Sequence, residues 1–374
     1  MTDSYFKKIL KYELQWCKTM GYFNPYIDPF NDFISKKIPD FDGQAYNRYP
    51  KYQFVYDKLW VMKSQGLICG RLEKLNENSN IKLPIFIKPR WGHKTASSKN
   101  CYKIKSWDEL NKYKHIQDLM WSEFIDDNEC MTDYILLNGT IVYQITYKYS
   151  PEQTGYIETW KYISPDNKPL PNITEWVQLH LSGFTGAVNV QYRGDKIIEV
   201  GLRLARGGAY ILSTKNKYLI QNINNVVERN HWDYGLENKM KYDSYYSFKC
   251  YTTAPVFYVF PQTSIDYIMK SYDCMPFYEY YFEPSGNDGS VFMQFMHKDF
   301  KVGMKCKSHL ENAVTYSQYI FIILFFVSLI LININKYVGI FLLIMIGLLY
   351  NTRFLNPFSV SYNQFKIMKL KYLS

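Results

Sequence analysis

The chain has 374 residues, of which 47% are hydrophobic and 21% are charged. A chain of this length can form two or three packed units, and this composition excludes a mainly disordered protein. The net charge is +10 at pH 7, but the lysines and arginines are spread along the chain, so we expect no nucleic-acid partner. Phosphate chemistry or an anionic membrane surface accounts for the excess positive charge equally well.

Residue usage gives two further expectations. The 36 tyrosines, with heavy use of Asn, Lys and Ile, indicate a coding bias toward AT-rich codons, as in some large DNA viruses or parasites. The seven cysteines contain no C-x-x-C pair and no Cys/His cluster at zinc spacing. They are therefore expected to be reduced thiols in a cytosolic compartment.

The sequence divides into four expected segments: 1–48, 49–215, 216–310 and 311–374. The first begins with an amphipathic helix over about its first 16 residues, which lack the apolar core of a signal peptide. A loop-rich stretch follows, and its Asp42-Gly43 dipeptide predicts a turn.

In the segment 49–215, apolar residues at helical spacing predict a helix over 52–66. A β-rich run predicts a strand over 83–89, followed by a glycine-, lysine- and serine-bearing loop over 90–100 and a short strand over 101–105. Ser106, three residues before Glu109, is typical of a capping box that starts a helix.

Turn signals predict the remaining elements. Asn138-Gly139 and Arg193-Gly194-Asp195 each lie between strand-like runs and predict β-hairpins. Helices are expected over 175–183 and, in the segment 216–310, over 217–230, with a strand over 290–296. The sum is an α+β protein with mainly antiparallel sheets.

Four stretches in this order resemble the ATP-grasp superfamily, whose two α+β subdomains enclose ATP. They are Tyr56-Asp57-Lys58-Leu59 with Lys63 and Gly66; Ile87-Lys88-Pro89; Ser122-Glu123-Phe124-Ile125 with Glu129; and Val188-Asn189-Val190-Gln191 with Ile198-Glu199-Val200-Gly201-Leu202-Arg203. The resemblance covers roughly 52–210 and implies the ATP-grasp fold.

The resemblance also implies roles at a nucleotide site. Lys58 and Lys88 would meet the α- and β-phosphates, and Lys94 lies on the loop that would close over the triphosphate. Glu123 and the backbone at Ile125 would meet the adenine edge. Glu129 would accept hydrogen bonds from the ribose hydroxyls.

The last strand pair would hold Mg²⁺, a hard ion that prefers oxygen ligands. Glu199 is the main ligand that the resemblance implies, and Gln191 would add an amide oxygen. Arg203 stands where the family stabilises an acyl-phosphate. Gly201 departs from the pattern, because the family usually has Asn there, and glycine has no side chain to bind a metal.

The function implied is therefore an ATP-dependent ligase that joins a carboxylate to an amine, with an unknown small-molecule or peptide acceptor. Two other interpretations remain open. The chain can be a nucleotide-binding pseudoenzyme, because of Gly201, or a membrane-bound structural protein, such as one in a virion.

The segment 311–374 contains a dense apolar run over 319–350, which Lys336 alone interrupts with a charge. Its two blocks, of about 16 and about 14 residues, are each short of the ~30 Å hydrocarbon core of a bilayer. They predict either a membrane-embedded helical hairpin or one tilted transmembrane helix. The alternative is a buried hairpin of a soluble protein.

Basic residues flank the run on both sides, at Lys305, Lys307 and His309 before it and at Arg353, Lys366, Lys369 and Lys371 after it. Positive flanks tend to stay cytoplasmic, which favours the hairpin. We therefore expect a membrane protein with its catalytic part facing the cytoplasm, in a host membrane or a virion.

Overall fold

The computed structural model describes residues 34–76, 81–94, 100–151, 153–154, 157–205, 216–252, 262–277 and 290–349. These residues divide into two compact units, one up to residue 247 and one from residue 248, and each is described by itself. The helix expected in the first 16 residues lies outside the described residues, as do residues 95–99 of the loop after the first strand.

A small antiparallel sheet forms one part of the first unit. Its strands are β1 (Cys69–Arg71), β2 (Ile85–Pro89), β3 (Tyr102–Ile104) and β4 (Leu119–Glu123), in the order β1-β4-β2-β3. Ile85, Ile87 and Ile104 are fully buried in its core with Leu110 of α4 (Trp107–Asn111). The Ser106 cap is confirmed, because its hydroxyl accepts a hydrogen bond from Glu109 N at 3.2 Å.

A larger sheet forms the other part of this unit. Its strands are β5 (Glu129–Leu137), β6 (Thr140–Tyr149), β9 (Trp160–Ile163), β10 (Gly186–Arg193) and β11 (Lys196–Gly201), in the order β11-β10-β5-β6-β9. A short ribbon, β7 (Gln153–Thr154) with β8 (Ile157–Glu158), precedes β9. Both expected hairpins are confirmed. Asn138 and Gly139 have φ of 52° and 83°, as a two-residue turn requires.

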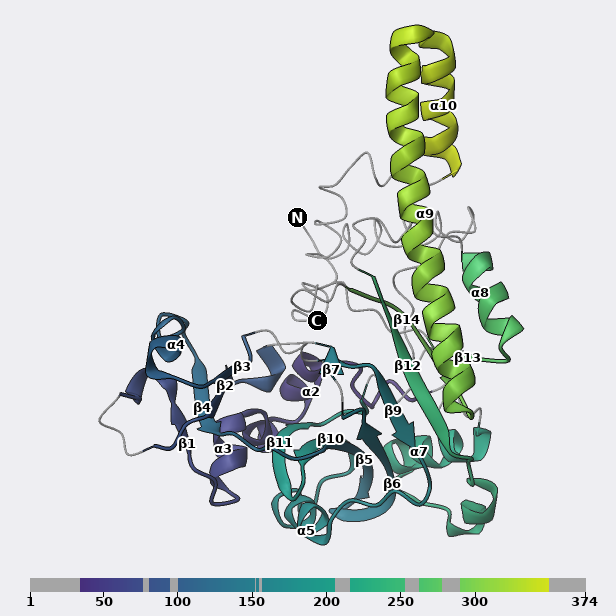
Figure 1. Cartoon of the computed structure of the whole chain (residues 1–374). Helices are drawn as coiled ribbons and strands as arrows, with labels where there is room; N and C mark the ends of the chain where they lie inside the picture. Colours follow the sequence, from purple (N-terminus) through teal and green to yellow (C-terminus); the bar gives the residue numbers. More distant parts are fainter. Residues whose placement is uncertain are drawn as a thin grey trace. The chain divides into compact units, whose positions relative to one another are not determined.

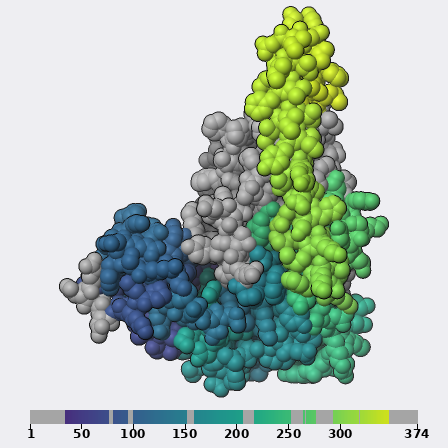
Figure 2. All heavy atoms as spheres, viewed as in Figure 1, coloured from purple at the N-terminus to yellow at the C-terminus, as the bar shows by residue number. Residues whose placement is uncertain are grey.

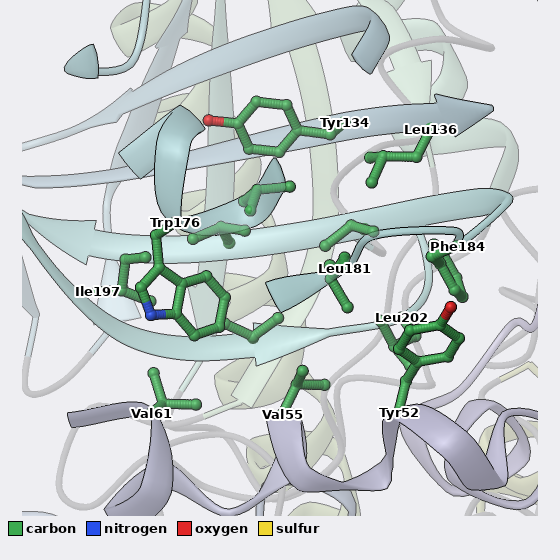
Figure 3. Close-up of a cluster of buried hydrophobic side chains, with 14 of the residues drawn as sticks. Tyr52, Val55, Val61, Tyr134, Leu136, Trp176, Leu181, Phe184, Ile197 and Leu202 are labelled. Carbon is green, nitrogen blue, oxygen red and sulfur yellow. The ribbon is translucent and has the colours of Figure 1, made fainter. Parts of the chain in front are cut away.

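The two faces of this sheet have different partners, because successive side chains of a strand point to opposite sides. One face is apolar and packs on α5 (Pro171–His180) and on η1 (Pro50–Tyr56) and α3 (Lys58–Lys63). Figure 3 shows Val55 and Val61 pointing toward Leu181 and Trp176 in this cluster. The alternate residues Glu129, Gln191 and Glu199 are therefore left on the opposite face.

Two short helices differ from the expectation. The helix predicted over 52–66 is divided into η1 and α3, because the carboxylate of Asp57 accepts from Leu59 N at 3.1 Å and starts a new helix there. The turn predicted at Asp42-Gly43 is wrong, since these residues begin α2 (Asp42–Arg48).

The first unit also contains α7 (Lys217–Arg229) and η5 (Tyr234–Lys239), besides the short η2 (Leu72–Lys74) and η3 (Gly92–Lys94). The helix expected over 217–230 is confirmed. Asn216 caps its start by accepting from Tyr218 N and Leu219 N, and Asn230 ends it in the left-handed conformation. Its apolar side packs with Ile135 and Ala187.

The second unit contains β12 (Tyr245–Thr252), α8 (Gln262–Ser271), β13 (Met275–Phe277), β14 (Ser290–His297), α9 (Phe300–Ile334) and α10 (Lys336–Leu349). The helix α9 begins well before the apolar run. In this early part Cys306, Leu310 and Val314 are fully buried. Lys307 is also buried, where it pairs with Glu311 and donates to the Lys249 carbonyl at 2.7 Å.

The expected helical hairpin is confirmed, with its tip at Asn335. Figure 1 shows α9 and α10 side by side, and Figure 2 shows their side chains packed as a narrow column. The two helices approach closely at Gly339, where a Cβ would lie 2.4 Å from Ile332 N. Large apolar side chains along both helices, including Ile323, Phe326 and Phe341, are exposed. Among the described residues, α9 is the helix long and apolar enough to cross a membrane.

The apolar face of the larger sheet should dominate the stability of the first unit. Leu136→Ala removes a fully buried side chain from its middle strand, so we expect the free energy of unfolding to fall by about 2–5 kcal/mol. The matched control is Leu179→Ala on α5, where the side chain is 72% exposed, with a change within about 0.5 kcal/mol. Urea unfolding followed by tryptophan fluorescence measures both. Equal effects would contradict this assignment of the core.

Candidate functional site

The face of the larger sheet opposite α5, part of which packs on α7, presents a row of oxygen-bearing side chains. Gln191 lies directly opposite Glu199 in the β10–β11 ladder, so both side chains emerge on the same face. Gln191 Nε2 donates to Glu129, and Arg193 Nη2 donates to the other oxygen of that carboxylate at 2.6 Å. Because the amide nitrogen of Gln191 is used, its amide oxygen is the atom that can accept a cation.

Lys58 joins this row from the first turn of α3. Its Nζ lies 3.1 Å from Glu199 Oε2, and the lysine side chain is buried while that of Glu199 is 37% exposed. Burial alone would lower the pKa of Lys58, but the negative charge of Glu199 and neighbouring groups outweighs it and raises the pKa. The lysine is therefore held as a cation beside a carboxylate that solvent can reach.

The start of α3 is fixed by a second ion pair. Arg90 donates through two nitrogens to the two oxygens of Asp57, the residue that caps α3. Lys58 N also donates to the Arg90 carbonyl at 2.9 Å. These contacts join the end of β2 to the helix that carries Lys58.

Lys88 reaches the same place from β2. Its Nζ donates to the Ile198 carbonyl of β11 at 2.8 Å, and its side chain is buried. Burial, and next the positive charge of Lys58, lower the pKa of Lys88 to about 8. The contact brings the small sheet and the larger sheet together, as the resemblance implies.

The loop after β2 passes over this pair of charges. A Cβ at Gly92 would lie 3.4 Å from Glu199 Oε1 and 3.6 Å from Lys58 Cε. The next side chain, His93, stacks on Tyr46 of α2 with ring centroids 3.7 Å apart. Burial, and next the charge of Lys94, lower the pKa of His93 to about 4, so this histidine is neutral at pH 7. Lys94 is exposed, with its Nζ 5.9 Å from the Trp91 ring centroid.

The residues that the resemblance implies for the base and the ribose lie at the end of β4, just after β4 and at the start of β5. Glu123 ends β4, where its backbone N donates to the Ile68 carbonyl at 3.0 Å. Ile125 is half-buried against the cluster of Leu59, Met62 and Met120. The carboxylate of Glu129 accepts bonds from both Gln191 and Arg193.

Arg203, just beyond β11, is paired with Asp42. Its Nη2 lies 2.5 Å from Asp42 Oδ2, and its Nη1 donates to the Leu204 carbonyl at 3.1 Å. Asp42 begins α2, far away in the sequence, and nothing in the local sequence marks it as a site residue. Asp57 and His93 were missed in the same way, since only the folded chain shows their partners.

A magnesium ion fits this site if the protein and phosphate groups each supply part of its ligands. Across the described ranges, no group of three or more His, Cys, Asp or Glu side chains could hold a metal by itself. Glu199 and the oxygen of Gln191 supply hard ligands on one face, and phosphate oxygens complete such a shell in nucleotide sites. The donor set therefore suits Mg²⁺ bound together with a polyphosphate.

Comparison with known proteins identifies the fold. No protein-family model matches the sequence, and a search of curated proteins finds no match. The structure is similar to that of carboxyaminoimidazole ribonucleotide synthase from Aspergillus clavatus complexed with ATP, with a TM-score of 0.52, 9% identity, and coverage of 71% of this chain and 74% of that chain. The chain has the ATP-grasp fold.

Two other similar structures have lower scores, and the fold assignment does not rest on them. L-amino acid ligase from Bacillus licheniformis matches with a TM-score of 0.45 and 13% identity, over 72% of this chain and 71% of that chain. A biotin carboxylase complex from Campylobacter jejuni matches with a TM-score of 0.44 and 12% identity, over 70% and 71%.

The lowered pKa of Lys88 gives a prediction about anion binding, with ATP as the probe. A polyphosphate favours the protonated lysine, so binding should take up a proton where the free lysine is neutral. As the pH rises through about 8, the affinity should fall, by up to about tenfold per pH unit. Calorimetry at pH 7 to 9.5, in buffers of different ionisation enthalpy, measures both effects.

The matched control is Lys88→Arg, which stays charged over this range and should bind ATP with a weaker pH dependence. Lys88→Ala should cost about 1.5–3 kcal/mol of binding free energy at pH 7. An identical pH profile in the Arg variant would assign the titration to another group.

Proposed function

We propose that this protein binds Mg-ATP and acts as an ATP-dependent ligase that joins a carboxylate to an amine. The observation that carries the proposal is the convergence of Lys58 and Lys88, from different elements, on Glu199 and its strand. Two buried lysines at one place are costly unless an anion or a carboxylate compensates them. A triphosphate with a bound cation satisfies all three groups.

In the proposed complex, each residue has a separate task. Lys58 and Lys88 bind the phosphates, and Lys94 of the exposed loop adds a third positive charge. Glu199 and the amide oxygen of Gln191 hold Mg²⁺, which neutralises charge on the phosphates when it is bound. Glu123 and the backbone at Ile125 meet the adenine edge, and Glu129 meets the ribose.

The chemistry proposed is transfer of the γ-phosphate to a carboxylate oxygen, which releases ADP and leaves an acyl-phosphate. The amine then attacks the acyl carbon, phosphate leaves, and the nitrogen loses a proton as the amide forms. Arg203 lies two residues beyond Gly201 and would stabilise the negative charge that develops on the acyl-phosphate. The acceptor would be a small molecule or a peptide with a free amine.

A second candidate is nucleotide binding without turnover. The observation in its favour is Gly201, which offers no side-chain ligand at the end of β11. Phosphate release from ATP, in the presence and absence of mixed carboxylates and amines, separates the two candidates. A protein that binds Mg-ATP but releases no phosphate under any of these conditions is a pseudoenzyme.

The metal site can be tested by Glu199→Gln, which removes the charge and keeps the shape. We expect the affinity for ATP in the presence of Mg²⁺ to fall about 10–100-fold, the effect typical of damaged metal sites, while the affinity for metal-free ATP changes much less. Glu175→Gln, at an exposed position of α5, is the control. If both variants bind Mg-ATP as the parent protein does, Glu199 is not a metal ligand.

We further propose that the α9–α10 hairpin anchors the protein in a membrane, in a host membrane or a virion, with the ligase part on the cytoplasmic side. The support is the exposure of its apolar side chains together with the polar tip at Asn333, Asn335 and Lys336. Lys307 contributes little to a positive flank, because it is buried and paired with Glu311. The remaining basic flank before the hairpin is smaller than the sequence indicates.

Deletion of residues 319–374 should give a soluble protein that still binds ATP. This cut keeps the part of α9 whose side chains Cys306, Leu310 and Val314 are buried, so the second unit retains its packing. The full chain should resist extraction from membranes by carbonate, and the truncated chain should not sediment with membranes. Release of the full chain by carbonate, or collapse of the truncated chain, would favour a buried hairpin instead.

A further inference from the structure

Gly201, the last residue of β11, has no side chain, and a residue of α2 fills the space beside it. Gly201 lies two residues after Glu199, so a side chain at 201 would point to the same face of the sheet. A Cβ built at Gly201 would lie 2.7 Å from Asp42 Oδ1. The φ of Gly201 is outside the left-handed region, so the backbone there does not require glycine. The carboxylate of Asp42 occupies the space instead.

The two oxygens of Asp42 are in different situations. Oδ2 is paired with Arg203 at 2.5 Å. Oδ1 is buried and has no hydrogen-bond partner among the described residues. A buried carboxylate oxygen without a donor is unfavourable in a folded protein.

Other contacts hold α2, which carries Asp42, against the loop after β2 that contains Gly92 and His93. Tyr46, one turn along α2, stacks on His93 at 3.7 Å and packs edge-on against Tyr56 at 5.7 Å. The hydroxyl of Tyr56 accepts from Leu202 N at 2.9 Å, beside Gly201. The contacts of Tyr46 with His93 and Tyr56 therefore fix the position of α2, and with it the position of Asp42.

A hard divalent cation is the ligand that matches this oxygen. Mg²⁺ takes oxygen atoms at about 2.1 Å and is usually held by one or two carboxylates together with phosphates. Glu199 and Gly201 lie two residues apart on one face of β11, Asp42 Oδ1 stands against Gly201, and the amide of Gln191 lies across from Glu199. Arg203 on the other oxygen would keep the Asp42 carboxylate in place.

We propose that Asp42 is a magnesium ligand that α2 supplies in place of the side chain absent at Gly201. The inference rests on the proposed Mg-ATP site and adds to it a residue from the N-terminal part of the chain. It also makes α2, which lies in the stretch expected to be loop-rich, part of the nucleotide site.

The experiment measures Mn²⁺ binding to the full chain in detergent micelles by electron paramagnetic resonance, with ATP present. Mn²⁺ is the probe because it takes the same oxygen ligands as Mg²⁺. Asp42→Ala should weaken Mn²⁺ binding at least about tenfold, a larger factor than any change in its affinity for metal-free ATP. Asp42→Asn keeps the shape, but its amide oxygen would stay with Arg203 and its NH₂ group would take the place of Oδ1, so its Mn²⁺ affinity should also fall.

A sharper test moves the metal-binding side chain from α2 to β11 by mutation. Gly201→Asn alone should not improve Mn²⁺ binding, because its side chain meets Asp42 Oδ1. The double variant Asp42→Ala with Gly201→Asn removes that conflict and places an amide oxygen on β11. It should recover most of the Mn²⁺ affinity that Asp42→Ala loses.

The outcomes separate this inference from the proposed function. If Glu199→Gln weakens Mn²⁺ binding and neither Asp42 variant does, Asp42 is only the counter-ion of Arg203 and the inference is overturned alone. If the parent protein binds no Mn²⁺ with ATP, the proposed function and the inference are both overturned. Should Asp42→Ala fail to fold, the Asn variant decides: parent-like Mn²⁺ affinity overturns the inference, and reduced affinity in a folded variant supports it.

Discussion

Two lysines buried beside one another, Lys58 and Lys88, are the interaction on which the first unit depends. Like charges in a low-dielectric setting repel, and each also loses its hydration. The structure offsets this with the Glu199 carboxylate on one lysine and the Ile198 carbonyl on the other. Both compensating groups lie on β11, so the strand that closes the larger sheet also holds the small sheet in place.

Hydrogen bonds between uncharged groups also connect β11 to the region of α3. The Gln65 amide accepts from Ile197 N at 2.7 Å and donates to the Ile197 carbonyl at 2.9 Å. The backbone of β11 is thereby bonded to the helix region that carries Lys58. The arrangement leaves Lys88 with a lowered pKa. The protonated form of Lys88 is therefore unfavourable in the protein alone, and a bound anion would stabilise it. For the proposed nucleotide site, this means that the charged groups would be in place before ATP binds.

The elements that local sequence determines could be predicted. The Asn138-Gly139 turn needs two residues of positive φ, and the Ser106 hydroxyl needs only a donor three residues away. The pairing of Gln191 with Glu199 also follows from a short hairpin, because register is fixed by the turn. These are contacts between residues close in the chain.

The rest depends on contacts that no local pattern encodes. Asp57 interrupts an apolar helical pattern because its carboxylate both caps α3 and binds Arg90, which lies 33 residues away. The Asp42 and Arg203 pair is separated by 161 residues. The Asp42-Gly43 dipeptide has strong turn propensity, and the packing of α2 on the loop after β2, where Tyr46 stacks on His93, overrides it. A resemblance could mark Gly201 as unusual, but only the fold shows what stands opposite it.

The two parts of α9 present their side chains differently. Its first part places Cys306, Leu310 and Val314 inwards, as a helix does when water is on its other side. Its second part has apolar side chains in all directions, and α10 approaches Ile332 closely at Gly339. In the proposed membrane anchor, this close packing of two helices would take the place of the hydrophobic effect. Because the helix is continuous through both parts, any tilt of the hairpin in a bilayer would be transmitted directly to the strands on which its first part packs.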